Sequence, residues 1–180
     1  MNVSNIKYFS TVNGDGIRTA VFVSGCRIHC KGCFNKEAWD FNFGKELTDD
    51  LVEKILESTS HDYIDGLTIL GGEPMDPDNQ CGVLSLIKKY RERYGTTKTI
   101  WLYTGYNLES IPKTGYTDSI LSFVDVVVDG PFIITKRNPE LAFRGSDNQR
   151  IIKGDNIHVI ANFSCSSKKN YEINGKTCDK

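Results

Sequence analysis

Apolar residues in this chain gather in short continuous runs that alternate with segments of helical periodicity. Continuous runs are typical of parallel strands covered by helices, because both faces of such strands are buried. We predict strands at 6–12, 17–24, 67–70, 99–103 and 124–128. The first two flank residues 13–16, Asn-Gly-Asp-Gly, which is a tight-turn signal.

Helices are predicted between the later strands. Thr48 is a suitable N-cap, and apolar positions within 47–56 mark one face of the helix that follows. A second helix is expected from about Asn79 to Tyr94, before a stop at Gly95, and a short third one near 117–122. This alternation indicates an α/β fold, in which sites are built from the loops at the carboxyl ends of the strands.

Composition narrows the class of protein. The chain has 180 residues, of which 39% are hydrophobic and 25% charged, and its net charge of −1 gives no indication of a nucleic-acid or anionic-membrane partner. The beginning of the chain lacks a signal-peptide pattern, and six cysteines without a secretory context predict a cytoplasmic protein. We expect one domain over 1–161 and a polar C-terminal tail over 162–180 that carries Cys165 and Cys178.

Three cysteines form the most informative motif. Cys26, Cys30 and Cys33 have the spacing C-x3-C-x2-C directly after an apolar run. Iron–sulfur clusters usually have four cysteine ligands, so a three-cysteine loop would leave one iron open for chemistry. A structural zinc site is the alternative, and it needs a fourth ligand. The candidates for that ligand are His29, His61, Cys81 and the tail cysteines.

A glycine-rich motif follows the strand at 67–70. It reads Gly71-Gly72-Glu73-Pro74. Two glycines allow a ligand to approach the backbone closely, and Glu73 offers an acceptor to an ammonium group. A plain strand-to-helix turn is the alternative interpretation.

Together the two motifs resemble the radical S-adenosylmethionine (SAM) superfamily. Within it, the chain is similar to the activases of glycyl radical enzymes, in particular those of anaerobic ribonucleotide reductase. This resemblance covers residues 6–152. Its further motifs are Val12–Arg18, Phe22–Cys26, Cys33–Lys36, Trp39, Trp101–Tyr106, Val126–Gly130 and Arg144–Arg150. The chain departs from the family pattern at Asp15, at Glu73, where aspartate is common, and at Pro131, where lysine is common.

The resemblance implies an oxidoreductase with two cofactors, a [4Fe-4S] cluster and SAM. Cys26, Cys30 and Cys33 would bind the cluster, and SAM would occupy the open iron. Reductive cleavage of SAM would give methionine and a 5′-deoxyadenosyl radical, which abstracts hydrogen from a glycine of the partner. The implied SAM contacts are Gly32, Cys33, Phe34, Gly71, Gly72 and Glu73.

The implied partners are the large catalytic subunit of anaerobic ribonucleotide reductase, which is a glycyl radical protein, and a reduced flavodoxin-type electron donor. An activase for another glycyl radical enzyme, of the pyruvate formate-lyase type, is a competing interpretation. The small size of the chain and the polar motif at 144–150 argue against it. A non-catalytic zinc or iron–sulfur binding module is a competitor of a different class.

The resemblance also implies a fold. We expect an incomplete TIM-like α/β barrel of the radical SAM type, with mostly parallel strands and outer helices. The chain is too short for a complete eight-unit barrel, which takes about 250 residues. Trp101 is predicted to be core because it lies in mid-strand, and residues 144–150 are predicted to form a rim that meets the reductase or SAM.

Overall fold

The computed structural model describes residues 1–157 and 160, and it has a mixed α/β architecture. The predicted tail at 162–180, with Cys165 and Cys178, lies outside the described residues. The strands are β1 (Asn2–Ser10), β2 (Arg18–Val23), β3 (Lys45–Glu46), β4 (Gly66–Gly71), β5 (Thr99–Tyr103), β6 (Val126–Asp129) and β7 (Arg150–Lys153). The α-helices are α1 (Asp49–Ser58), α2 (Pro77–Tyr94) and α3 (Thr117–Phe123). Short 3-10 turns are η1 (Lys36–Trp39), η2 (Leu108–Ser110) and η3 (Ile134–Lys136).

The described strands form one seven-stranded sheet in the order β3-β1-β2-β4-β5-β6-β7. The four central strands, β2, β4, β5 and β6, are parallel, which the continuous apolar runs predicted. The strands on either side, β1, β3 and β7, pair in the antiparallel direction. The two edge strands do not pair with each other, so the sheet is open.

Local signals set the helix boundaries. The side chain of Thr48 caps α1 by accepting a hydrogen bond from the backbone N–H of Leu51, as expected. The second helix begins at Pro77, two residues before the predicted start, because Asp76 is its N-cap and proline is favoured in the first turn. It ends at Gly95, which has a φ of 55°.

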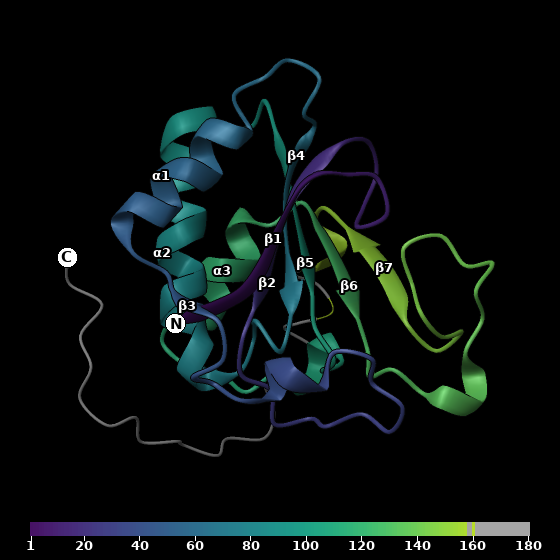
Figure 1. Cartoon of the computed structure of the whole chain (residues 1–180). Coiled ribbons are helices and arrows are strands. Elements are labelled where there is room, and N and C mark those ends of the chain that lie inside the picture. Colours follow the sequence, from purple (N-terminus) through teal and green to yellow (C-terminus); the bar gives the residue numbers. More distant parts are fainter. Residues whose placement is uncertain (158–159, 161–180) are drawn as a thin grey trace.

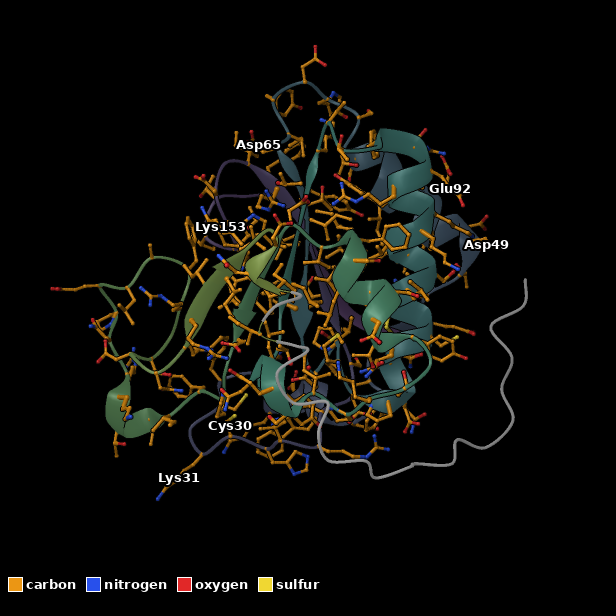
Figure 2. The ribbon with its side chains drawn as sticks, turned by 180° about the vertical axis from the view of Figure 1, so that it is seen from behind. Cys30, Lys31, Asp49, Asp65, Glu92 and Lys153 are labelled. Carbon is orange, nitrogen blue, oxygen red and sulfur yellow. The ribbon has the colours of Figure 1, made fainter. Side chains whose placement is uncertain are left out.

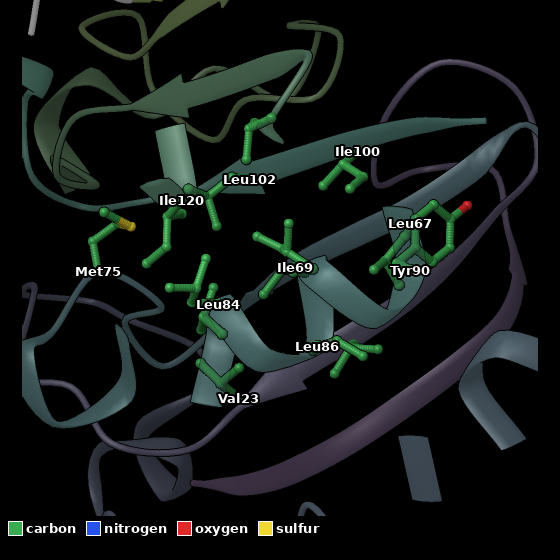
Figure 3. Packing of buried hydrophobic residues seen from close by; sticks show 14 of the residues in the cluster. Val23, Leu67, Ile69, Met75, Leu84, Leu86, Tyr90, Ile100, Leu102 and Ile120 are labelled. Carbon is green, nitrogen blue, oxygen red and sulfur yellow. The ribbon is translucent and has the colours of Figure 1, made fainter. Parts of the chain in front are cut away.

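The main core lies between one face of the sheet and the three helices (Figure 1). Figure 3 shows Leu67, Ile69, Ile100 and Leu102 of the sheet packed against side chains of α2. The second face of the sheet carries a smaller cluster around Trp101, and the segment 131–149 lies on that side of the sheet (Figure 1). Trp101 is buried, as predicted.

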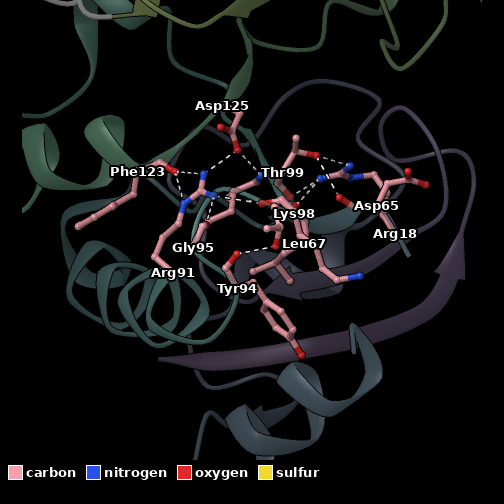
Figure 4. A network of polar contacts seen from close by, with 12 residues as sticks. Arg18, Asp65, Leu67, Arg91, Tyr94, Gly95, Lys98, Thr99, Phe123 and Asp125 are labelled. Carbon is pink, nitrogen blue, oxygen red and sulfur yellow. Dashed lines mark hydrogen bonds and ion pairs between the residues drawn. The ribbon is translucent and has the colours of Figure 1, made fainter. Parts of the chain in front are cut away.

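A polar network lies where β4 and β5 begin (Figure 4). Arg18 is fully buried and donates hydrogen bonds to the carbonyl oxygens of Leu67 and Thr99, each at 2.8 Å. Burial lowers the pKa of Arg18 to about 10. Arg91 pairs with Asp125 at 2.6 Å. This network fixes the end of the sheet that lies away from the cysteine loop.

The described part of the chain contains no helix with both the length and the apolar character needed to cross a membrane.

Candidate metal centre

The loops that follow the central strands border one cavity of about 410 Å³. Its lining includes Cys26 after β2, Gly72 after β4, Thr104 after β5 and Gly130 after β6. Parallel strands bring their carboxyl ends to the same edge, so the predicted gathering of these loops is confirmed. Figure 2 shows Cys30 at this end of the molecule and Asp65, which precedes β4, at the opposite end.

The three predicted thiols, Cys26, Cys30 and Cys33, all line this cavity, and all three are free. Cys26 is buried, and the other two are half-buried. Burial raises the pKa values of Cys26 and Cys30, whereas the backbone N–H groups of Ile28 and His29 oppose the rise at Cys26. These thiols therefore bind metal only after losing protons, so binding should strengthen as pH rises.

Arg27 attaches the cysteine loop to α2. Its guanidinium pairs with Asp76, the helix N-cap, and with Asp78 in the first turn. It also lies 4.4 Å from the ring centroid of Phe41. Sequence reasoning missed this clamp, because the residues are about fifty positions apart and each alone looks like an ordinary surface charge.

Asn79 joins the cysteine loop to the glycine-rich loop. Its side-chain amide nitrogen lies 2.9 Å from the carbonyl oxygen of Ser24, 3.2 Å from that of Gly25 and 2.9 Å from that of Glu73. Asn79 is buried at 2% exposure. The sequence identified this residue only as the expected start of a helix, although a polar residue next to Gly-Gly-Glu-Pro was an available signal.

Glu73 lines the cavity but is engaged by the protein itself. One carboxylate oxygen accepts hydrogen bonds from the backbone N–H of Met75 at 2.8 Å and from the hydroxyl of Thr104 at 2.7 Å. The other accepts from the backbone N–H of Gly105 at 2.7 Å. Burial raises the pKa of Glu73 to about 7, and the three hydrogen bonds oppose that rise. The carboxylate thus holds the loop after β5 against the loop after β4.

The two glycines before Glu73 are required by packing within the protein. Gly71 has a φ of 114°, and a Cβ there would lie 2.7 Å from the carbonyl oxygen of Val23. A Cβ on Gly72 would lie 2.5 Å from the carbonyl oxygen of Gly25. The close contact between the loops after β2 and β4 therefore explains these glycines, in addition to the ligand approach that the sequence suggested.

Phe34 and Gly32 occupy different positions around the cavity. Phe34 lines it and is 97% exposed, so its ring lies at the mouth. Gly32 has a φ of 81° and is not among the lining residues; a Cβ there would lie 3.1 Å from Ile134. Gly32 therefore shapes the cysteine loop.

The polar motif at 144–150 divides between two tasks. Arg144, Gly145 and Gln149 line the cavity, in agreement with the predicted rim. Arg150 instead pairs with the buried Asp129 and with Glu109, the latter at 2.8 Å. This ion-pair network fixes the end of β6 to β7.

The donor set fits an iron–sulfur cluster. Within residues 1–157 and 160, no group of three or more His, Cys, Asp or Glu side chains is arranged to hold a single metal ion. A zinc ion requires its ligands to converge on one atom, whereas each thiolate of a [4Fe-4S] cluster binds a different iron. Three free thiols around a shared cavity suit the second arrangement.

Comparison with known proteins agrees with this geometry. The family described as "4Fe-4S single cluster domain" matches residues 12–152. An anaerobic ribonucleoside-triphosphate reductase-activating protein of Vibrio cholerae is 38% identical, and the match covers 84% of this chain and 97% of the relative. Proteins with the same name from Enterobacteria phage T4 and Escherichia coli K12 are 37% and 34% identical, and the matches cover 93% and 96% of those relatives and 84% and 83% of this chain.

Proposed function

Since this chain belongs to the family of anaerobic ribonucleoside-triphosphate reductase-activating proteins, we propose that it activates such a reductase by generating a glycyl radical on the large catalytic subunit. The radical would arise from reductive cleavage of SAM at a [4Fe-4S] cluster. The observation that carries this proposal is the meeting of three free thiols and the Gly-Gly-Glu-Pro loop at one cavity.

The proposal extends to features of the whole protein. We take the open sheet as a partial barrel of the radical SAM type, formed by a single domain that reaches about residue 161. The expected setting is the cytoplasm, and the expected electron donor is a reduced flavodoxin-type protein.

The described side chains have definite tasks in this proposal. A bound [4Fe-4S] cluster with SAM supplies the one-electron chemistry that amino-acid side chains lack. Cys26, Cys30 and Cys33 hold the cluster, and the clamp of Arg27 keeps their loop in place. Glu73 fixes the loop at Thr104 and Gly105, so that backbone groups rather than a free carboxylate face the ligand. Apolar lining residues such as Phe132 exclude water from the reaction.

Anaerobic reconstitution tests the function. The protein is purified without oxygen, supplied with iron and sulfide, reduced and mixed with SAM and the reductase. We expect 5′-deoxyadenosine, detected by chromatography, and a glycyl radical signal on the reductase by electron paramagnetic resonance. A zinc-loaded protein that yields neither product would exclude the proposal, and a radical formed only on another glycyl radical enzyme would redirect it.

Ligand variants test the three-thiol centre. Cys26→Ala, Cys30→Ala and Cys33→Ala should each reduce 5′-deoxyadenosine formation to background, because each removes one of three cluster ligands. Cys165→Ala and Cys178→Ala are the matched controls and should retain the product yield of the parent protein. Loss of bound iron in either control would show that the tail contributes a ligand.

A further inference from the structure

Two buried polar groups line the cavity without a partner among the described residues. They are the hydroxyl of Tyr103 and the Nε of Arg144. Buried polar atoms in folded proteins nearly always have a hydrogen-bond partner, and an exception needs an explanation. Two exceptions that line the same cavity point to a ligand that supplies the missing partners.

Both residues are held in place by the protein. Tyr103 ends β5 and packs against the Trp101 cluster on the second face of the sheet. Arg144 follows Phe143 in the segment 131–149, and its Nη1 donates to the carbonyl oxygen of Gln149 at 3.2 Å. The Gln149 side chain in turn accepts from the backbone N–H of Gly145 at 2.8 Å. The unpartnered atoms are therefore presented by ordered elements.

The chemistry of the two groups defines what they can bind. The Nε of arginine only donates, and burial raises the pKa of Tyr103, so that its hydroxyl stays protonated and can also donate. The ligand must therefore bring acceptors. The sulfonium of SAM is positively charged and would be repelled by the guanidinium of Arg144. A different molecule must supply these acceptors.

The rest of the lining indicates a polypeptide segment. Val12, Phe132, Leu141 and Phe143 make much of the wall apolar, and Phe34 lies exposed at the mouth. A peptide segment offers main-chain carbonyl acceptors without net charge, together with small apolar surfaces. We infer that Tyr103 and Arg144 bind main-chain carbonyl oxygens of the glycine-bearing segment of the reductase, an inference that rests on the proposed function.

The test measures how efficiently SAM cleavage is coupled to radical transfer. The reconstituted full chain is mixed with the reductase, and glycyl radical formed is divided by 5′-deoxyadenosine produced. Tyr103→Phe and Arg144→Met should each lower this ratio about tenfold and raise the apparent KM for the reductase, because each removes a hydrogen bond to the partner. Tyr63→Phe, at an exposed tyrosine outside the cavity lining, is the control and should keep the ratio of the parent protein.

Tyr103→Phe keeps the inference falsifiable if Arg144→Met misfolds, since no described residue depends on the Tyr103 hydroxyl. An unchanged ratio in Tyr103→Phe would overturn the inference. A parallel loss of radical and 5′-deoxyadenosine would also overturn it, because the groups would then serve SAM. A parent protein that forms neither product would instead overturn the proposed function, which distinguishes the two failures.

Discussion

At the scale of single residues, Glu73 shows how context changes a side chain's task. Its position in the motif suggested an acceptor for the ammonium group of SAM. The carboxylate is instead surrounded by Met75, Thr104 and Gly105, all of which donate to it. A buried carboxylate that joins two loops explains the residue without direct ligand contact.

The raised pKa of Glu73 predicts a pH dependence of stability. The folded state holds this proton up to a pH of about 7, whereas the unfolded chain releases it near 4.5, so the stabilising contribution present below 4.5 is lost as pH rises through 7. The unfolding free energy of the apo protein relative to Glu73→Gln should fall by about 2 kcal/mol between pH 5 and pH 8. Urea unfolding at several pH values measures this difference, and parallel pH profiles for the two proteins would contradict it.

At the scale of elements, the first turn of α2 organises the site. Its N-cap and first helical residues bind Arg27 of the cysteine loop, and Asn79 binds three carbonyl oxygens from two loops. The helix therefore sets the distance between the thiols and the Gly-Gly-Glu-Pro loop. Gln80, the next residue, bridges the carbonyl oxygens of Met75 and Pro112 instead.

This division predicts different outcomes for two neighbouring amides. Asn79→Asp places an acceptor against three carbonyl oxygens, so it should lower the unfolding free energy by about 3 kcal/mol. It should also lower the iron bound per folded protein after reconstitution. Gln80→Glu is the matched control: it should destabilise the fold while leaving iron binding close to that of the parent, because Gln80 does not touch the cysteine loop. Equal iron content in both variants would refute the special role of Asn79.

At the scale of the whole molecule, the open sheet divides the labour between its faces. The helices and the main core cover one face, and the cavity lies at the carboxyl ends of the central strands beside the segment 131–149. The stability of the fold and the chemistry of the site thus draw on different parts of the molecule. The cysteine loop belongs to the second part, where few residues are buried without a ligand.

Cluster binding should therefore stabilise the protein by linkage, because a ligand that binds only the folded state shifts the unfolding equilibrium. The reconstituted protein should unfold about 5 °C or more above the apo protein, as a few kcal/mol would give for a chain of this size. Calorimetry under anaerobic conditions measures the difference. Cys30→Ala should show no such gain, and a gain of equal size in that variant would place the bound iron elsewhere.

Local patterns in the sequence determined much of this protein. Apolar runs gave the central parallel strands, capping residues gave α1, and the strand Thr99–Tyr103 was predicted to the residue. Since the carboxyl ends of parallel strands meet, the order of the strands also predicted that the cysteine loop and the glycine-rich loop share a cavity. These features follow from short-range spacing, which the chain carries in every window of ten to twenty residues.

Only the tertiary structure decided which side chains answer one another across that cavity. The clamp of Arg27 on α2, the bonds of Glu73 to Thr104 and the orphan hydroxyl of Tyr103 all depend on residues from separate elements. The openness of the sheet is also a tertiary result, because it depends on where the last strand pairs. Such contacts form when burial brings distant polar groups to one place, and no local pattern specifies which of them will meet.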